Sequence, residues 1–89
     1  MRAPSRKELR LLARQAIQGS GLSKAQLARD AGLSRAALNA WIAGARTPGP
    51  DSLDRLASGL EARAEALHAL AGKLRGAARA KRAAGESGA

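Results

Sequence analysis

Two side chains near the middle of the chain combine hydrogen-bonding chemistry with helical spacing. Arg35 and Asn39 are four positions apart, so a helix across this region places both on one face. An arginine can donate two hydrogen bonds to the major-groove edge of guanine, and an asparagine can pair with adenine. Ala36 could meet a thymine methyl group. These residues predict contacts with base edges, and Ala40 is a lesser candidate because its side chain is too short to reach unless the helix lies deep.

Simpler roles remain open for the two polar side chains. Arg35 could bind a phosphate without reading the sequence, because most hydrogen bonds between proteins and nucleic acids go to the backbone. Asn39 could be a solvated position on the outside of a helix. The choice between these roles depends on the elements that hold the residues.

Two serines and a lysine stand where phosphates could bind. Ser23 and Lys24 offer a hydroxyl group and a positive charge at the start of a predicted helix, where free amides and the helix dipole attract anions. Ser34 offers a hydroxyl group at the start of the next predicted helix. Each serine has an alternative role as a helix cap alone, since its side chain readily accepts the free N–H groups of a first turn.

The elements that position these residues are two short helices joined by a tight turn. The first is predicted over residues 23–31 and stops at Gly32, where a left-handed backbone is needed. The second is predicted over residues 34–43. So short a joint makes the helices cross at close range, and Ala28 and Ala37 are the small residues placed at that crossing.

The lone aromatic residue belongs to the second of these helices. Trp41 falls opposite the face predicted to read bases and in register with Leu38, so we interpret it as a packing residue and not as a ligand contact. The predicted structural core of this unit is Leu27, Ala28, Gly32, Leu38 and Trp41.

The segment LSKAQLARDAGLSRAALNAWIAGARTP resembles the helix-turn-helix of the Cro/cI, or xenobiotic-response-element-type, regulators. The shared pattern is a leucine-serine start, a leucine-alanine pair, a glycine turn, a hydrophobic-serine restart, and a tryptophan followed by a glycine and a basic, proline-containing loop. The likeness covers roughly Leu9 to Leu60, and Ile42 departs from it where many members carry a glutamate. The matching residues, in order, are Leu22, Ser23, Leu27, Ala28, Gly32, Leu33, Ser34, Trp41, Gly44, Arg46 and Pro48.

This resemblance implies both a fold and a way of binding DNA. The implied fold is an all-α, compact five-helix domain like that of lambda repressor, with the second helix of the motif in the major groove. By the same resemblance, Arg46 and Thr47 in the following loop would grip the phosphate backbone beside the bases that are read.

Further helices are predicted on both sides of the motif. Residues 6–18 form the first, which begins at a capping box of Ser5 and Glu8. A loop rich in glycine and proline precedes a fourth helix over residues 51–58, and Ser58-Gly59 is predicted to be its stop or a bend. In the first helix the positions predicted to face inward are Leu9, Leu12, Ala13, Ala16 and Ile17, while Arg6, Arg10 and Arg14 line another face that we interpret as mainly solvated.

The C-terminal third shows a heptad pattern. A fifth helix is predicted over residues 61–84, followed by a disordered tail over residues 85–89, and both lie outside the DNA-binding domain assigned to residues 1–60. The alternative is that the leucines only cover the core, and Gly72 and Gly76 weigh against a long rigid coil. The possible dimer seam consists of Leu60, Ala64, Leu67, Ala71 and Leu74.

Charge narrows the class of partner. The chain of 89 residues has a formal net charge of +9, but residues 48–72 hold two basic and four acidic residues, so the acidic part follows the motif. A basic motif followed by an acidic segment is typical of a protein that presents one side to a polyanion. With one aromatic residue in the chain, binding of single strands by base stacking is disfavoured, and duplex DNA is expected. Abundant arginine and alanine suggest a GC-rich bacterial or phage genome.

Several other functions are not supported. The absence of cysteine excludes disulfides and thiolate metal sites, and His68 has no companion ligand, so no metal or other cofactor is expected. Neither serine of the motif has a catalytic histidine nearby in sequence, and we expect no enzyme. No signal peptide or membrane span is recognisable, so a soluble, cytoplasmic, nucleoid-associated protein is expected in a bacterial or phage-infected cell.

The sequence thus predicts a sequence-specific regulator of the repressor type that binds double-stranded DNA and no small molecule. One recognition helix buries little surface, so two copies are expected on a palindromic site about one helical turn apart. One alternative is an interaction or assembly module, antitoxin-like or a phage adaptor, that binds a protein through its C-terminal helix. Another is a non-specific nucleic-acid binder.

Overall fold

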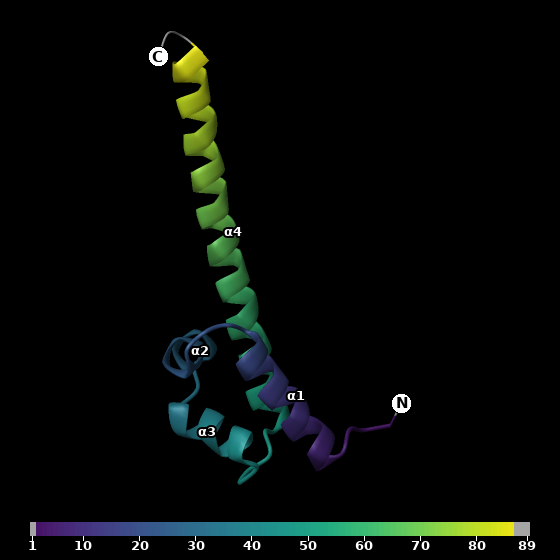
Figure 1. The fold of residues 1–89 in the computed structure, drawn as a ribbon. Helices are drawn as coiled ribbons and strands as arrows, with labels where there is room; N and C mark the ends of the chain where they lie inside the picture. Colours follow the sequence, from purple (N-terminus) through teal and green to yellow (C-terminus); the bar gives the residue numbers. More distant parts are fainter. Residues whose placement is uncertain (1, 87–89) are drawn as a thin grey trace.

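Four helices make up most of the chain in the computed structural model, which describes residues 2–86 (Figure 1). Three short helices and the start of a long fourth helix form a globular body, and the rest of the fourth helix projects from it. The described part contains no strand, so the prediction of an all-α fold is confirmed. The helices are α1 (Arg6–Gly19), α2 (Lys24–Ala31), α3 (Arg35–Ala43) and α4 (Pro50–Glu86).

Each of the first three helices begins at a serine that acts as an N-cap. The hydroxyl oxygens of Ser5, Ser23 and Ser34 each accept the backbone N–H three residues ahead, at 3.1 Å. The predicted starts of these helices are therefore confirmed. The capping box at Ser5 differs from its usual form, because the Glu8 carboxylate accepts from the Ser5 hydroxyl at 3.2 Å.

A left-handed glycine makes the tight turn between α2 and α3. Gly32 has φ +66°, and its N–H bonds to the carbonyls of Ala28 and Arg29. The N–H of Leu33 then reaches the Ala28 carbonyl at 2.9 Å. These bonds close the end of α2 and let Ser34 cap the next helix two residues after the glycine. The predicted helix-turn-helix geometry follows directly from these contacts.

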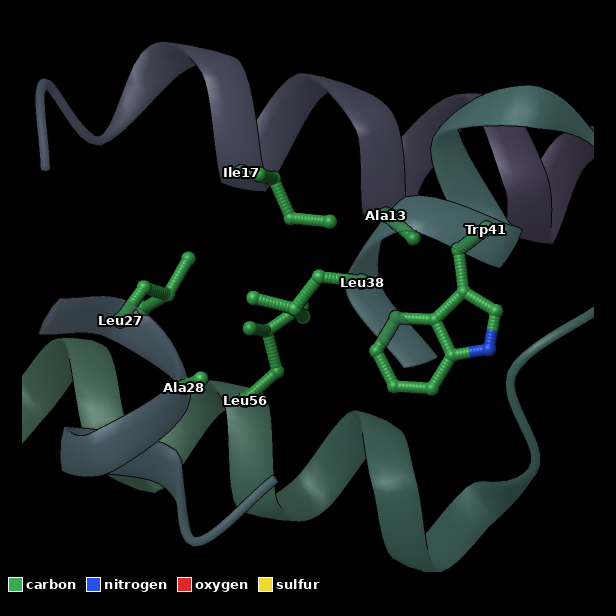
Figure 2. Packing of buried hydrophobic residues seen from close by; sticks show 7 residues of the cluster. All are labelled: Ala13, Ile17, Leu27, Ala28, Leu38, Trp41 and Leu56. Carbon is green, nitrogen blue, oxygen red and sulfur yellow. The ribbon is translucent and has the colours of Figure 1, made fainter. Parts of the chain in front are cut away.

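All four helices contribute to one hydrophobic core, which Figure 2 shows. Leu27 and Leu38 are fully buried, and Trp41 is 5% exposed, as expected for packing residues. Ala28 lies in the core and Ala37 packs against it, in keeping with their predicted place where the helices cross. The cluster consists of Ala13, Ile17, Leu27, Ala28, Leu38, Trp41 and Leu56. Gly32, which the sequence predicts as part of the core, is exposed, because its place is in the turn that ends α2.

The prediction of five helices is wrong, because no break occurs at Ser58-Gly59. α4 continues through this point, and Gly59 is buried where α2 approaches. A Cβ atom at position 59 would lie 2.8 Å from Ala31 backbone atoms. The glycine therefore serves close packing of two helices and does not end one.

Two other predictions need correction. Leu12 was expected to face the core, but it is 55% exposed, because the inward face of α1 is centred on Ala13 and Ile17. α4 extends to Glu86, two residues beyond its predicted end at Ala84, so part of the predicted disordered tail is helical. The remaining tail residues, 87–89, lie outside the described residues. The division into domains at residue 60 stays a prediction.

Candidate nucleic-acid interface

The exposed face of α3 carries the residues predicted to contact bases. Arg35, Ala36 and Asn39 are all exposed, whereas Leu38 and Trp41 hold the opposite face in the core. Ala40 is partly covered, because five positions after Arg35 it has turned toward the side of the helix. The structure therefore brings Arg35, Ala36 and Asn39 together and leaves Ala40 at the margin.

The polar groups on this surface are free to bind a ligand. Within residues 2–86, the side chains of Arg35, Asn39, Lys24 and Arg46 make no hydrogen bond or ion pair with the rest of the chain. All four are exposed. Their donors are therefore satisfied by solvent and could be transferred to phosphates or base edges without breaking contacts inside the protein.

The start of α2 combines a cap with an exposed charge. The Ser23 hydroxyl oxygen accepts the Gln26 N–H at 3.1 Å, so its hydroxyl hydrogen remains available as a donor to an anion. Lys24 follows as the first residue of the helix. Ser34 has the same arrangement at the start of α3, through the Ala37 N–H. Capping and phosphate contact are thus compatible for both serines.

The loop after α3 is anchored to the end of that helix. Gly44 has φ +77°, and the N–H groups of Ala45 and Arg46 reach the Ala40 carbonyl at 2.9 and 3.3 Å. The Arg46 side chain is exposed, while Thr47 is half-buried beside the buried Pro48. The backbone therefore holds Arg46 at the end of α3, and Thr47 is less accessible.

Basic residues of α1 lie beside the end of α3, which sequence reasoning missed. Arg10 donates from Nη1 to the Gly44 carbonyl at 3.1 Å. Lys7, Arg10 and Arg14 line one shallow hollow together with Ile42. The only available signal was their helical spacing, which fits a solvated face equally well. Contact between residues 34 positions apart could not be read from that pattern.

Ile42 lies between this hollow and the start of α2. A second hollow is lined by Ile42, Ser23 and Lys24, together with residues at the end of α1. The start of α2 and the basic side of α1 therefore flank the same part of α3. This arrangement places positive charge on both sides of Ile42.

An ion pair fixes α2, and with it the motif, on α4. Arg63 donates from Nε and Nη2 to the two carboxylate oxygens of Asp30, at 3.0 and 3.2 Å. Gln26 donates to the same carboxylate at 2.8 Å. The hydrogen bonds from Arg63, followed by that from Gln26, hold the pKa of Asp30 below its ordinary value of 3.8. Asp30 therefore has a structural role behind the interface.

The residues of the possible dimer seam lie away from this surface. Leu60 packs against the core, whereas Leu67 and Leu74 are exposed on the projecting part of α4. His68 is exposed. Among the described residues, no group of three or more histidine and acidic side chains could hold a metal ion, and no helix is long and apolar enough to span a membrane.

α2 and α3 are two short helices joined by a glycine turn, and basic residues surround the exposed face of α3. These features define the class of helix-turn-helix proteins. Residues 7–67 match the family model described as helix-turn-helix, of the Cro/cI type. The chain belongs to this family of DNA-binding regulatory domains. Searches of curated proteins and of solved structures found no match.

Proposed function

We propose that the protein is a sequence-specific regulator of the repressor type, with α3 in the major groove of duplex DNA. The observation that carries this proposal is the exposed face of α3, on which Arg35 and Asn39 have free donors while the opposite face is buried. In this arrangement Arg35 reads guanine, Asn39 reads adenine and Ala36 contacts a thymine methyl group. Occupation of an operator would then exclude or recruit polymerase.

Phosphate contacts position the reading face in this proposal. Ser23 and Lys24 bind the backbone at the start of α2, and Arg46 binds it beyond the end of α3, with Ser34 and Thr47 in supporting positions. The basic side of α1 adds Lys7 and Arg14 to this set, because they lie next to the end of α3. These contacts supply affinity without selecting a sequence.

Self-association completes the proposed function. A single recognition helix buries too little surface for tight specific binding, so two copies are expected to bind two half-sites. The exposed leucines of α4 support association between copies. They also support the second candidate function, an interaction module that binds another protein through α4. Purification of the chain with a stoichiometric protein partner would favour that second candidate.

Selection of bound duplexes from a random DNA pool tests the proposal. We expect a preferred motif with two half-sites, and gel shifts on that motif should show a steep loss of affinity with rising salt, because several phosphates are neutralised. Arg35→Ala and Asn39→Ala should each change the preferred bases. If no motif is recovered and neither substitution alters the binding pattern, the proposal of specific reading is wrong.

A further inference from the structure

The half of α4 beyond Arg63 carries an apolar stripe that the described chain leaves uncovered. Leu67, Leu70 and Leu74 are 53%, 52% and 73% exposed. Figure 1 shows this half projecting from the globular body, away from the other helices. An α-helix repeats its direction after about 18 residues. Leu74 therefore points to the same side of α4 as the buried Leu56, so the stripe continues the face that packs in the body.

An apolar hollow forms the base of this stripe. It is lined by Leu12 and Ala16 from α1 and by Leu53, Ala57 and Leu60 from α4, with almost no polar surface. The α4 residues of the hollow continue the heptad seam of the projecting half in alternating steps of four and three. The exposed Leu12, whose position disagreed with the sequence prediction, thus borders the same surface.

A row of polar residues runs along one flank of the seam. Glu61, His68, Arg75 and Arg82 recur at intervals of seven, and all are exposed. The row is acidic at the end near the body and basic at the far end. The other flank, at Arg63, Leu70, Ala77 and Ala84, contains no acidic residue.

The charge gradient selects the orientation of a second copy. In a parallel pair the row would face the opposite flank of the second helix, where no acidic residue is present, and the basic far ends would lie side by side. In an antiparallel pair the row of one helix lies beside the same row of the other helix, which runs in the opposite direction. Glu61 of one copy then lies beside Arg82 of the other, and this attractive pair occurs twice.

We propose that residues 60–85 of α4 pair antiparallel with the same segment of a second copy. Leu67 then meets the region of Ala78 in the other copy, and the end of each helix reaches toward the hollow beside Leu12. The two globular bodies stand at opposite ends of a pair about 39 Å long, so neither has to be accommodated beside the other. This geometry separates the two half-sites by more than the single helical turn of DNA that the sequence predicts. This inference rests on the self-association included in the proposed function and adds its geometry.

Disulfide trapping distinguishes the two orientations, since the chain has no cysteine of its own. Leu67→Cys and Ala78→Cys are made separately, with an affinity tag on one chain, and are oxidised alone and as a mixture without DNA. In the antiparallel pair the mixture forms a mixed disulfide. Each variant alone does not, because its two thiols lie about 16 Å apart along the axis. Disulfides that join two copies of the same variant, with no disulfide between Leu67→Cys and Ala78→Cys, would show a parallel pair and overturn the proposal.

Charge exchange provides a second test that leaves the apolar stripe intact. Glu61→Arg and Arg82→Glu should each weaken dimerisation severalfold in sedimentation equilibrium, and the double variant should recover the wild-type dissociation constant. No recovery in the double variant, or a wild-type chain that stays monomeric at several hundred micromolar, contradicts the pairing. DNA selection is read out separately, so a failure of pairing is distinguishable from a failure of base reading.

Discussion

The two halves of α4 share one apolar stripe but have different surroundings. In the first half Leu56 is 3% exposed and holds the body together, whereas Leu74 in the second half is 73% exposed. Gly59 lies where α2 touches the first half, while a Cβ atom at Gly72 in the second half would meet nothing within 4 Å. The same type of residue therefore stabilises the fold in one half and is available for association in the other.

The largest difference is expected for the leucines. Leu56→Ala should lower the free energy of unfolding by about 2–5 kcal/mol, because it removes a buried side chain and leaves a cavity. Leu74→Ala should change it by less than about 0.5 kcal/mol in the monomer. Urea unfolding at a protein concentration below that of dimerisation measures both. Comparable losses in the two variants would mean that the projecting half is packed in solution.

Alanine substitutions at the two glycines should change the stability of the protein in opposite directions. Gly59→Ala should cost about 1–3 kcal/mol, because its Cβ atom would press on the backbone of Ala31 and move α2 away. Gly72→Ala should instead stabilise the helix by up to about 1 kcal/mol, since alanine is the better helix former. Thermal unfolding followed by circular dichroism compares them. A gain in stability from Gly59→Ala would argue against the close contact of α2 and α4.

A smaller effect, which depends on pH, should come from the ion pair where the body ends. The pKa of Asp30 is lower in the folded protein than its ordinary value of 3.8, so its contribution is present above that value and is lost as pH falls through the folded pKa. Asp30→Asn should therefore destabilise the protein at pH 7 and have less effect near pH 3. Unfolding in urea at both pH values measures this, with the exposed Glu65→Gln as control. A constant difference between wild type and Asp30→Asn would exclude the linkage.

Local signals explain what could be predicted from the sequence. Serine caps and the left-handed Gly32 act within three or four residues of themselves, so the first three helices and the turn were predictable. The exposed placement of Arg35 and Asn39 followed from helical spacing opposite Trp41. Their contacts with DNA remain predictions.

Contacts between distant segments explain what the sequence did not reveal. A glycine after a serine is typical of a helix end, and only the approach of α2 shows why Gly59 lies inside a helix. The same holds for Arg10, whose bond to Gly44 depends on how α1 packs beside α3. Leu12 has the spacing of a core residue, yet it lies at the edge of the inward face, where exposure depends on the neighbouring helices.

The proposed function depends most on the reading of base edges by Arg35 on α3. The most direct measurement is fluorescence anisotropy at fixed salt with the selected duplex and a scrambled duplex, for wild type, Arg35→Ala and Lys73→Ala. Lys73→Ala removes the same charge from the projecting half of α4. Arg35→Ala should reduce the ratio of the two affinities by about five- to 150-fold, the equivalent of the about 1–3 kcal/mol of a bidentate contact. Lys73→Ala should leave the ratio unchanged. An unchanged ratio in Arg35→Ala would show that Arg35 does not read a base.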